Sequence, residues 1–419
     1  MKIAIVGLGY VGLPLALRFA QAGVEVLGVD VDAAKCASLN AGQSYIKHIA
    51  SAAVAQAVAS GRLQATTDFA RTRAVEAILI CVPTPLNEHR EPDMAYVFGT
   101  GESLAPHLRP GQLVVLESTT YPGTTDTDLR AILERGSGLV AGRDFHLAFS
   151  PEREDPGNSQ WDAHRIPKVV GGLTPACRDR AVACYERAIA RVVPVSSCRV
   201  AEAAKLLENI FRSVNIALVN ELKVVYSAMD LDVWEVIEAA KTKPFGFMPF
   251  YPGPGLGGHC IPIDPFYLTW KARQYGQHTR FIELAGEVNS AMPAYVVQRA
   301  IAALGRPLAG ARILLLGLAY KPGVDDDRES PTYALMQLFE AQGAQVAYHD
   351  PHVPVIRPTR EHPQYAGRKS APLSPDGYNL AVLVTAHAEY RDFDFSPWSI
   401  PLVDTRNCVR RKPVGYFQA

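Results

Sequence analysis

A glycine-rich turn at the start of the chain constrains the fold more than any other feature. Residues 2–6 (KIAIV) have the pattern of a buried strand, and Gly7, Gly9 and Gly12 follow in G-x-G-x-x-G order ahead of a helical pattern. The first glycine permits a tight turn, the second lets the backbone approach a pyrophosphate, and the third lets helix and strand pack closely. The phosphates would lie at the helix N-terminus, where free N–H groups and the helix dipole favour negative charge. The sequence therefore predicts a dinucleotide-binding βαβ unit.

Asp30 supports this prediction and limits the choice of dinucleotide cofactor. It is the last residue of a second apolar strand pattern at 24–30. A carboxylate in this place accepts hydrogen bonds from the adenosine ribose and repels a 2′-phosphate, which favours NAD over NADP. Lys35 lies a few residues further on and would partly compensate for that repulsion. FAD is the main competing cofactor.

The rest of the chain alternates short apolar runs with helical patterns, which is typical of a mostly parallel sheet. The last third repeats the first in outline, since Gly343, Val346 and Asp350 stand where Gly23, Val26 and Asp30 stand. Its first turn, 317–330, lacks the three-glycine pattern, so we expect it to bind a different phosphate-bearing group or none. The expected strands lie at 24–30, 77–82, 113–118, 145–150, 312–317 and 343–350. The predicted fold class is α/β, with two Rossmann-like doubly wound parallel-sheet domains joined by a long central helical connector.

A long helical pattern without Gly or Pro separates the two repeats, at 201–229, and a second one covers 280–304. Lys205 and Asn209, followed by Arg212 or Ser213, recur on one face, so we expect a polar stripe on an otherwise buried helix. A largely apolar helix of this length also favours a homodimer or higher homo-oligomer. The predicted domains are an NAD-binding domain at 1–198, a helical connector at 199–304 and a second, C-terminal Rossmann-like domain at 305–419.

Composition excludes several classes of protein. Lys plus Arg and Asp plus Glu number 42 each, so overall charge gives no reason to expect nucleic acid or a membrane surface as a partner. No apolar run approaches the roughly 18 residues of a membrane span, and the chain enters a strand pattern at its second residue, so we expect a cytoplasmic protein. Its seven cysteines contain no C-x-x-C pair, so we expect neither a disulfide framework nor a metal site.

One of these cysteines, Cys260, lies in the stretch PGPGLGGHCIPIDP at 252–265. A thiolate can add to an aldehyde, and the adduct can lose a second hydride to leave a thioester, so an NAD enzyme could take an alcohol to a carboxylate. Gly257 and the glycine after it would let substrate and cofactor approach closely, and a helix would begin near Asp264. A buried structural cysteine is the other reading, and the loop by itself leaves both open.

Seven ordered motifs along almost the whole chain decide between these readings by resemblance. They are GLGYVGLPLA (7–16), CVPTP (81–85), ESTTYPGTT (117–125), SPERE (150–154), EAAKLLEN (202–209), GPGLGGHCIPIDP (253–265) and GLAYKPGVDDDRESP (317–331). With these motifs the chain resembles the nucleotide-sugar 6-dehydrogenases of the UDP-glucose/GDP-mannose dehydrogenase family. The resemblance implies a four-electron, two-NAD oxidation of a sugar C6 alcohol to a uronic acid. It also implies an NAD domain, a helical connector and a C-terminal UDP-sugar-binding domain, which would be 305–419.

The resemblance assigns catalytic roles residue by residue. Cys260 matches the nucleophile, Asp264 the acid that assists water or proton transfer, and Lys205 the lysine that contacts the C6 oxygen, with Asn209 as its partner. Glu152 matches a glutamate near nicotinamide and substrate, and Thr119 a threonine that positions the attacking water. An ammonium and an amide at i, i+4 on one helix would point the same way and could stabilise an oxyanion.

The binding residues follow in the same way. The expected NAD-binding residues are Gly7, Gly9, Tyr10, Val11, Gly12, Asp30, Lys35, Pro83, Thr84, Thr119, Glu152 and Arg328. The expected substrate-binding residues are Glu152, Arg153, Lys205, Asn209, Phe250, Tyr251, Gly255, Gly257 and Lys321. Lys321 resembles the lysine that reaches the nucleotide phosphates, and Arg328 the arginine that closes over the cofactor pyrophosphate.

Two departures from the UDP-glucose branch bear on the substrate. Pro156 stands where that branch has a second glutamate, so Glu154 or Asp155 would replace it or the role is absent, and Ile263 stands where a cofactor-contacting lysine is frequent. Both features resemble the bacterial UDP-N-acetylhexosamine dehydrogenases of surface-polysaccharide pathways. The resemblance implies UDP-N-acetylglucosamine as substrate, with UDP-glucose, UDP-N-acetylgalactosamine and UDP-N-acetylmannosamine as alternatives. A two-electron alcohol dehydrogenase and an inactive NAD- or nucleotide-sensing scaffold are the rival functions.

Overall fold

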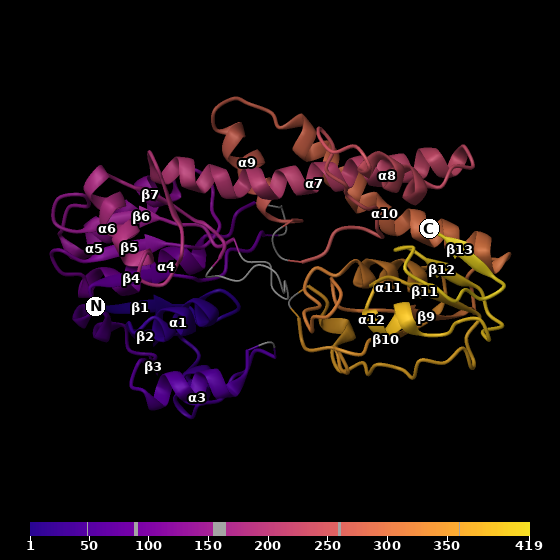
Figure 1. Cartoon of the computed structure of the whole chain (residues 1–419), viewed down its shortest axis with the longest axis horizontal. Coiled ribbons are helices and arrows are strands. Elements are labelled where there is room, and N and C mark those ends of the chain that lie inside the picture. The colour runs from indigo at the N-terminus through magenta and orange to yellow at the C-terminus, as the bar shows by residue number, and fades with distance from the viewer. Residues whose placement is uncertain (48, 88–90, 154–164, 259–260, 360) are drawn as a thin grey trace. The chain divides into compact units, whose positions relative to one another are not determined.

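The structure is a computed structural model of the whole chain (Figure 1). It describes residues 1–47, 49–87, 91–153, 165–258, 261–359 and 361–419. The chain forms two compact units, and each is described by itself. The first comprises 1–208 and 266–278, and the second comprises 209–265 and 279–419.

The first unit is built on a sheet with the strand order β3-β2-β1-β4-β5-β6-β7-β8. Its strands are β1 (Lys2–Val6), β2 (Glu25–Val29), β3 (Leu63–Thr66), β4 (Ala77–Ile80), β5 (Leu113–Leu116), β6 (His146–Phe149), β7 (Lys168–Gly172) and β8 (Val192–Val195). The described strands pair in parallel except for β6 and β7, which are antiparallel. The expected parallel sheet is therefore confirmed, while β3 and the antiparallel β7 are additions that apolar patterning did not indicate.

Helices cover both faces of this sheet. They are α1 (Gly12–Gln21), α2 (Ala33–Asn40), α3 (Ser51–Ala59), α4 (Ala95–Leu104), α5 (Arg130–Ser137) and α6 (Pro175–Tyr185), with shorter turns η1 (Phe69–Ala74), η2 (Ala105–His107) and the π-helical η3 (Thr124–Leu129). On one face, Ile3 and Ile5 of β1 share a core with Phe19 of α1 and Tyr185 of α6. Because burial of this apolar surface stabilises the sheet as a rigid body, the loops at the strand ends are held in fixed positions.

The second unit contains a parallel sheet with the order β10-β9-β11-β12-β13. Its strands are β9 (Arg312–Leu316), β10 (Gln345–His349), β11 (Leu380–Leu383), β12 (Leu402–Asp404) and β13 (Tyr416–Gln418). Its helices include α8 (Val233–Lys241), α10 (Arg280–Leu304), α11 (Pro331–Ala341) and α12 (Ala388–Asp392), with the short turn η4 (Pro363–Tyr365). The predicted repeat is confirmed, because β9 and β10 pair in parallel as β1 and β2 do.

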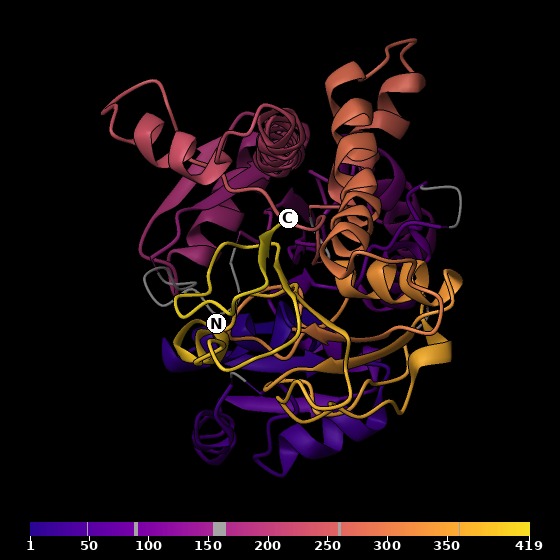
Figure 2. The ribbon, with the colours of Figure 1, turned by 90° about the vertical axis from the view of Figure 1, so that its right-hand side faces the viewer.

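Two further helices carry candidate site residues, α7 (Cys198–Ala228) and α9 (Asp264–Arg273). Figure 2 views α7 almost along its axis. Neither α7 nor any other helix within the described ranges is long and apolar enough to cross a membrane.

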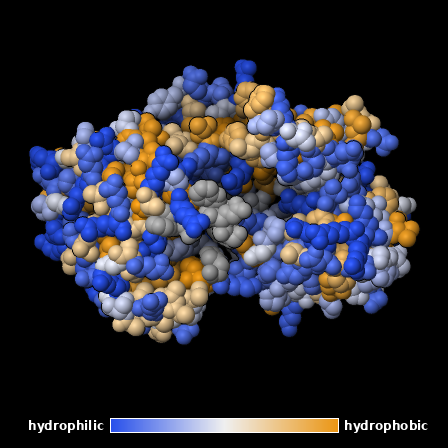
Figure 3. Space-filling view, viewed as in Figure 1, coloured by the Kyte–Doolittle hydropathy of each residue, from blue (hydrophilic) through white to orange (hydrophobic). Residues whose placement is uncertain are grey.

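We expected the apolar side of α7 to be buried, and this prediction is wrong. The polar stripe is covered, with Lys205, Asn209 and Ser213 between 5% and 8% exposed. In contrast, Leu207 is 67% and Leu218 is 51% exposed. Helical periodicity identifies the residues that share a face, but the neighbours of the helix decide which face is covered. On the face that Figure 3 presents, apolar patches also lie between hydrophilic ones.

Candidate active site

The turn between β1 and α1 has the geometry that a dinucleotide pyrophosphate requires. Gly7 has a φ of 90°, and a Cβ there would lie 2.5 Å from the carbonyl oxygen of Cys81. A Cβ on Gly12 would lie 1.8 Å from the carbonyl oxygen of Gly7, whereas a Cβ on Gly9 would meet nothing within 4 Å. The first and third glycines therefore serve the packing of the turn, and the second leaves open space beside the backbone. These residues fit NAD, which would lie there with its phosphates at the α1 N-terminus.

Asp30 lies directly after β2 and is 7% exposed. Its carboxylate accepts hydrogen bonds from the backbone N–H of Leu8 at 2.8 Å and of Asp32 at 3.0 Å. The carboxylate thus fixes the glycine turn, and its remaining lone pairs suit the ribose of NAD. The Lys35 ammonium lies 6.0 Å from the centre of the Tyr45 ring.

The residues expected near the nicotinamide follow β4 and β5. Thr84 is buried, and its carbonyl oxygen accepts a hydrogen bond from the Tyr267 hydroxyl at 2.9 Å, while Pro83 is exposed. Thr119 is half-buried in the loop after β5. These positions lie at the carboxyl ends of parallel strands, where doubly wound sheets bind their ligands.

A buried glutamate holds the loop that carries Thr119. Glu202 of α7 accepts the backbone N–H of Gly123 at 2.7 Å and both the N–H and the hydroxyl of Thr125, at 2.9 and 2.7 Å. Burial raises the pKa of Glu202 to about 7, against the hydrogen bonds from Thr125 and Gly123, which lower it. Glu202 lies one helical turn before Lys205, so the same stretch of α7 carries a candidate catalytic residue and anchors a site loop.

Glu152 follows β6 and belongs to a buried charged group. The Lys168 ammonium lies 3.3 Å from one Glu152 oxygen and 2.5 Å from a Glu117 oxygen. The second Glu152 oxygen accepts the backbone N–H of Arg153 at 2.6 Å. Glu152 is therefore held from two sides at the edge of the sheet where Thr84 and Thr119 also lie.

Arg153 makes contacts within its own unit. Its guanidinium lies 2.6 Å from a Glu208 oxygen and donates to the Pro167 carbonyl at 2.6 Å. Glu154, Asp155 and Pro156, which bear on the second family glutamate, lie outside the described residues.

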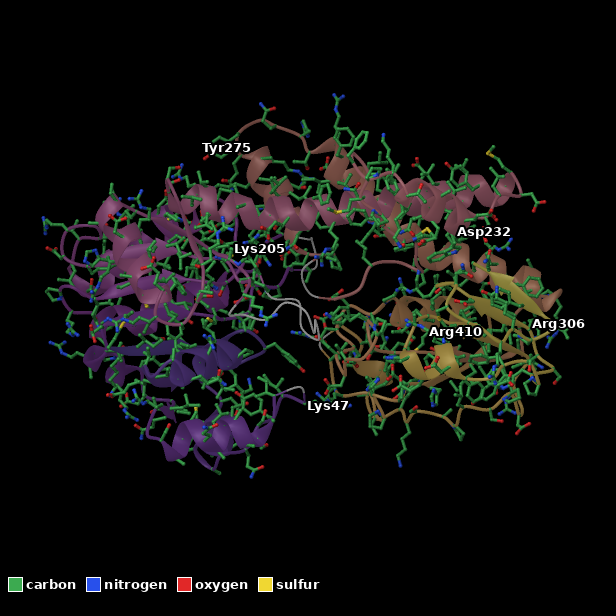
Figure 4. The ribbon with its side chains drawn as sticks, in the orientation of Figure 1. Lys47, Lys205, Asp232, Tyr275, Arg306 and Arg410 are labelled. Carbon is green, nitrogen blue, oxygen red and sulfur yellow. The ribbon has the colours of Figure 1, made fainter. Side chains whose placement is uncertain are left out.

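In the second unit, two of the expected catalytic residues meet. The Asn209 amide donates a hydrogen bond to an Asp264 oxygen at 2.6 Å, and the two residues are 7% and 2% exposed. Asp264 is the first residue of α9, where the helix dipole stabilises a carboxylate. Lys205, one turn before Asn209 on α7, is labelled in Figure 4 and is 8% exposed.

The glycine-rich loop is fixed at its described residues. The Gly253 N–H donates to the Asn220 side chain at 2.9 Å, and the Gly258 N–H donates to the Arg328 carbonyl at 3.3 Å. A Cβ on Gly257 would lie 2.8 Å from the Tyr320 Cβ, and one on Gly258 would lie 2.8 Å from the Tyr320 ring. These two glycines thus admit Tyr320, and the close approach of substrate and cofactor to them stays a prediction. His259 and Cys260 lie outside the described residues, and Ile263 after them is buried.

The remaining expected binding residues have partners of several kinds. Arg328 forms a two-point ion pair with Asp326, at 2.6 and 2.9 Å, and the Lys321 ammonium lies 5.7 Å from the Tyr320 ring centre. Phe250 contacts Phe211 edge to face at 5.6 Å, and Tyr251 stacks on Trp234 at 5.9 Å. Gly255 has a φ of 133°, and a Cβ there would lie 3.3 Å from Pro331. Tyr10 and Val11 are half-buried in the glycine turn.

Sequence reasoning missed several residues that shape the site: Glu117, Lys168, Tyr185, Glu202 and Asn220. Glu117 and Glu202 lie inside motifs that had been recognised, so each motif could have drawn attention to its acid. Lys168 gave no such signal, because it lies 51 residues from Glu117 and no local pattern joins them.

Together, a glycine turn suited to NAD, an acid at the end of β2 and polar residues at the strand ends define an NAD-dependent dehydrogenase of the Rossmann type. Family models match three consecutive regions of the chain. They are the NAD-binding domain (1–189), the central domain (199–291) and the UDP-binding domain (314–411) of the UDP-glucose/GDP-mannose dehydrogenase family. The chain belongs to this family. It is an NAD-dependent nucleotide-sugar 6-dehydrogenase, and its substrate is a UDP-sugar.

Individual relatives agree on the class and differ in the sugar. The chain is 36% identical to UDP-N-acetyl-D-glucosamine 6-dehydrogenase of Pseudomonas aeruginosa over 94% of this chain and 92% of that protein. It is 39% identical to UDP-N-acetyl-D-mannosamine dehydrogenase of Yersinia pestis over 80% and 82% of the two chains. Among solved structures it resembles UDP-D-ManNAc dehydrogenase of Pyrococcus horikoshii, with a TM-score of 0.89, 31% identity and coverage of 100% and 99%.

Proposed function

We propose that the chain oxidises the C6 hydroxyl of UDP-N-acetylglucosamine to a carboxylate, for surface-polysaccharide synthesis in the cytoplasm. Support for the sugar comes from the Pseudomonas aeruginosa relative, which aligns with 94% of this chain. The second candidate is UDP-N-acetylmannosamine, which the 39% identity to the Yersinia pestis enzyme favours. The domain limits of 1–198, 199–304 and 305–419 are part of the proposal.

The buried hydrogen bond between Asn209 and Asp264 is the observation that carries the proposed chemistry. It joins α7 to the first turn of α9, four residues after Cys260. A carboxylate with an amide donor at 2.6 Å is held in one orientation, as a group that moves a proton at a defined atom must be. In the proposal, Asp264 transfers protons and Lys205 stabilises the developing negative charge on the C6 oxygen.

Two oxidations follow each other at the same carbon. NAD, when bound, accepts a hydride in each of them. After the first, the Cys260 thiolate adds to the aldehyde carbon, and the carbonyl oxygen takes up a proton. The second oxidation leaves a thioester, and water, positioned by Thr119 and Glu152, displaces the thiolate to release the uronic acid.

Counting NADH per sugar tests both the substrate and the mechanism. Purified enzyme would receive UDP-glucose, UDP-N-acetylglucosamine, UDP-N-acetylgalactosamine, UDP-N-acetylmannosamine or GDP-mannose in separate reactions. We expect two NADH per UDP-N-acetylglucosamine and the highest kcat/KM for that sugar. One NADH per sugar would contradict the covalent mechanism, and a higher kcat/KM for another sugar would contradict the proposed substrate.

The thiol is tested by substitution. Cys260→Ser should abolish acid formation while the NAD dissociation constant stays unchanged, because Cys260 is outside the glycine turn. Cys408→Ser is a matched control, since it replaces a cysteine of the second unit that has no proposed role. Acid formation by Cys260→Ser at the wild-type rate would exclude covalent catalysis.

A homodimer is part of the proposal, and the exposed side of α7 supports it. Four apolar residues recur along this side and are 45% to 67% exposed: Leu207, Phe211, Leu218 and Val225. A second copy would bury this apolar stripe, and the interface would be self-complementary under two-fold symmetry. Sedimentation equilibrium should give a dimer for the wild type and a shift to monomer for Phe211→Glu. A wild-type monomer at working concentration would contradict the proposal.

A further inference from the structure

Lys168 links the candidate active site to the interior of the first unit. Its side chain is 7% exposed, and its ammonium is shared between Glu117, whose side chain is fully buried, and Glu152, whose side chain is 18% exposed. The Tyr185 hydroxyl donates to the second Glu117 oxygen at 2.5 Å. The chain of contacts therefore runs from Tyr185 of α6 through Glu117 and Lys168 to Glu152.

The charges of this group depend on each other. Burial favours a neutral Lys168, but Glu117 and Glu152 outweigh this effect and raise its pKa, so Lys168 stays protonated. Burial also raises the pKa of Glu117, against the opposite influence of Lys168. Two carboxylates thus share one cation, and removal of that cation would leave a buried negative charge without compensation.

Three described residues near Glu152, namely Arg153, Cys81 and Tyr185, do not take the place of Lys168. Arg153 offers Glu152 its backbone N–H, while its guanidinium is paired with Glu208 of α7. Cys81, after β4, lies close enough to interact electrostatically with Glu152 and Glu117, and burial raises its pKa well above the usual value, so it stays neutral. Tyr185 is held by Glu117, and burial raises its pKa as well.

We propose that Lys168 is a positioning residue, which keeps the Glu152 carboxylate ionised and oriented at the carboxyl ends of β5 and β6. Glu117 and Tyr185 anchor the ammonium from the interior. The inference deepens the proposed function, because it assumes that Glu152 takes part in the reaction. A buried ion pair contributes little net stability by itself, and the inference gives this pair a role at the active site instead.

The inference makes opposite predictions for the two partners of the ion pair. An opposite charge within about 4–6 Å lowers the pKa of a carboxyl group by about 1–3 units, and a nearby like charge raises it. Lys168→Met should therefore move the ionisation of Glu152 to higher pH by about one unit or more. Glu117→Gln should move it to lower pH, because the ammonium then serves Glu152 alone.

Two measurements report this ionisation. The first is a ¹³C NMR titration of protein labelled at the glutamate side-chain carboxyl, in which Glu152→Gln identifies the Glu152 resonance by its loss. The second is the acid limb of kcat/KM against pH, which reflects groups of the free enzyme. The titration needs no turnover, so the inference is tested even if none of the sugars is oxidised and the proposed function fails.

Conservative and neutral variants separate positioning from stability. Lys168→Arg keeps the charge and should keep the Glu152 midpoint near its wild-type value. Tyr185→Phe removes an anchor hydroxyl and should lower thermal stability with little change in that midpoint. If Lys168→Met does not fold, the double variant Glu117→Gln/Lys168→Met removes both buried charges and should still raise the midpoint. A Glu152 midpoint that stays unchanged in folded Lys168 variants and in Glu117→Gln would overturn the inference.

Discussion

The two Rossmann-like repeats have similar first turns, but the space beside the turn is open in the first repeat and filled by the protein in the second. Gly7 and Gly317 both have positive φ, 90° and 99°, and each turn is followed by an acid after the second strand. The second glycine of the first repeat, Gly9, borders open space, but its counterpart Ala319 is fully buried. The first turn can therefore admit a pyrophosphate, while the second is filled by the protein itself.

The acids that follow the second strands, Asp30 and Asp350, also differ in how many groups of the protein they bind. Asp30 accepts two described backbone N–H groups, whereas Asp350 accepts those of Leu318, Ala319, His352 and Val353 and also faces His387 at 3.2 Å. Burial raises the pKa of Asp350, but His387 and the N–H groups of Ala319 and Leu318 outweigh this effect, so the pKa lies well below its usual value. Asp30 therefore keeps lone pairs for a ligand, whereas those of Asp350 are used by groups of its own unit.

His387 is saturated too, which bears on a possible metal site. His352, His387 and Glu389 offer ligand atoms within 4.8 Å of one another. Since the Gly323 N–H donates to Nδ1 of His387, its Nε2 carries the proton toward Asp350. In this arrangement His387 has no lone pair left for a metal ion.

Asp350→Ala should have the largest effect of these substitutions, which is a loss of stability. Four N–H groups and a histidine would lose their acceptor, and breaking a buried pair of this kind costs about 3–5 kcal/mol. Urea unfolding should show that loss, and the NAD dissociation constant should stay unchanged. Weakened NAD binding in a folded Asp350→Ala protein would break the contrast between the repeats.

Gly12→Ala should have the next largest effect, in the first repeat. Its Cβ would lie 1.8 Å from the Gly7 carbonyl oxygen, and overpacking against backbone costs up to about 3 kcal/mol. We expect lower thermal stability and loss of NAD binding in calorimetric titration. Gly9→Ala is the matched control, because its Cβ meets nothing in the protein and should weaken NAD binding alone. Equal melting temperatures for the two variants would argue against this reading of the glycines.

Glu202 and Asp350 should give the two units opposite pH responses. The pKa of Glu202 is about 7 in the folded protein and about 4.3 in an unfolded chain, so the folded state binds the extra proton. Its stabilising effect is complete below the unfolded value and is lost as pH rises through about 7, by about 2 kcal/mol between pH 5 and 8. The lowered pKa of Asp350 instead stabilises above about pH 4 and is lost as pH falls. Urea unfolding of Glu202→Gln at both pH values should lack the loss seen in the wild type, and an unchanged pH dependence would contradict the assignment.

Asp30→Asn should give the smallest effect. An amide keeps one acceptor but loses the charge, so we expect NAD affinity to fall about tenfold, or about 1.4 kcal/mol. Asp350→Asn serves as the control in the second repeat and should leave NAD affinity unaltered. If Asp30→Asn bound NAD as tightly as the wild type, the acid would not hold the ribose.

The order of strands and helices was largely predictable, because apolar periodicity and glycine placement are local signals. The α10 helix has the predicted bounds, Arg280–Leu304, and α7 lies within three residues of those expected. The short strand β3 has only four residues, one of which is exposed, so its apolar pattern is weak. The antiparallel β7 depends on its pairing with β6, which no local pattern indicates.

The site was predictable where one motif contains the whole arrangement. The Gly7 to Gly12 turn is an example, because backbone geometry over six residues decides which positions tolerate a Cβ. Lys205 and Asn209 were likewise placed on one face by helical spacing. Whether that face is buried could not be predicted, because burial depends on neighbouring elements that helical periodicity does not identify.

By itself, the sequence determined the two βαβ repeats, the glycine turn and the acids that follow each second strand. Only the tertiary structure decided that Ala319 closes the second turn, that Asn209 meets Asp264, and that Lys168 joins Glu117 to Glu152. The physical reason is the range of the interactions. Steric limits on a backbone act between adjacent residues, but a charge in the protein interior is compensated by whichever residue the packed sheet brings within a few ångströms.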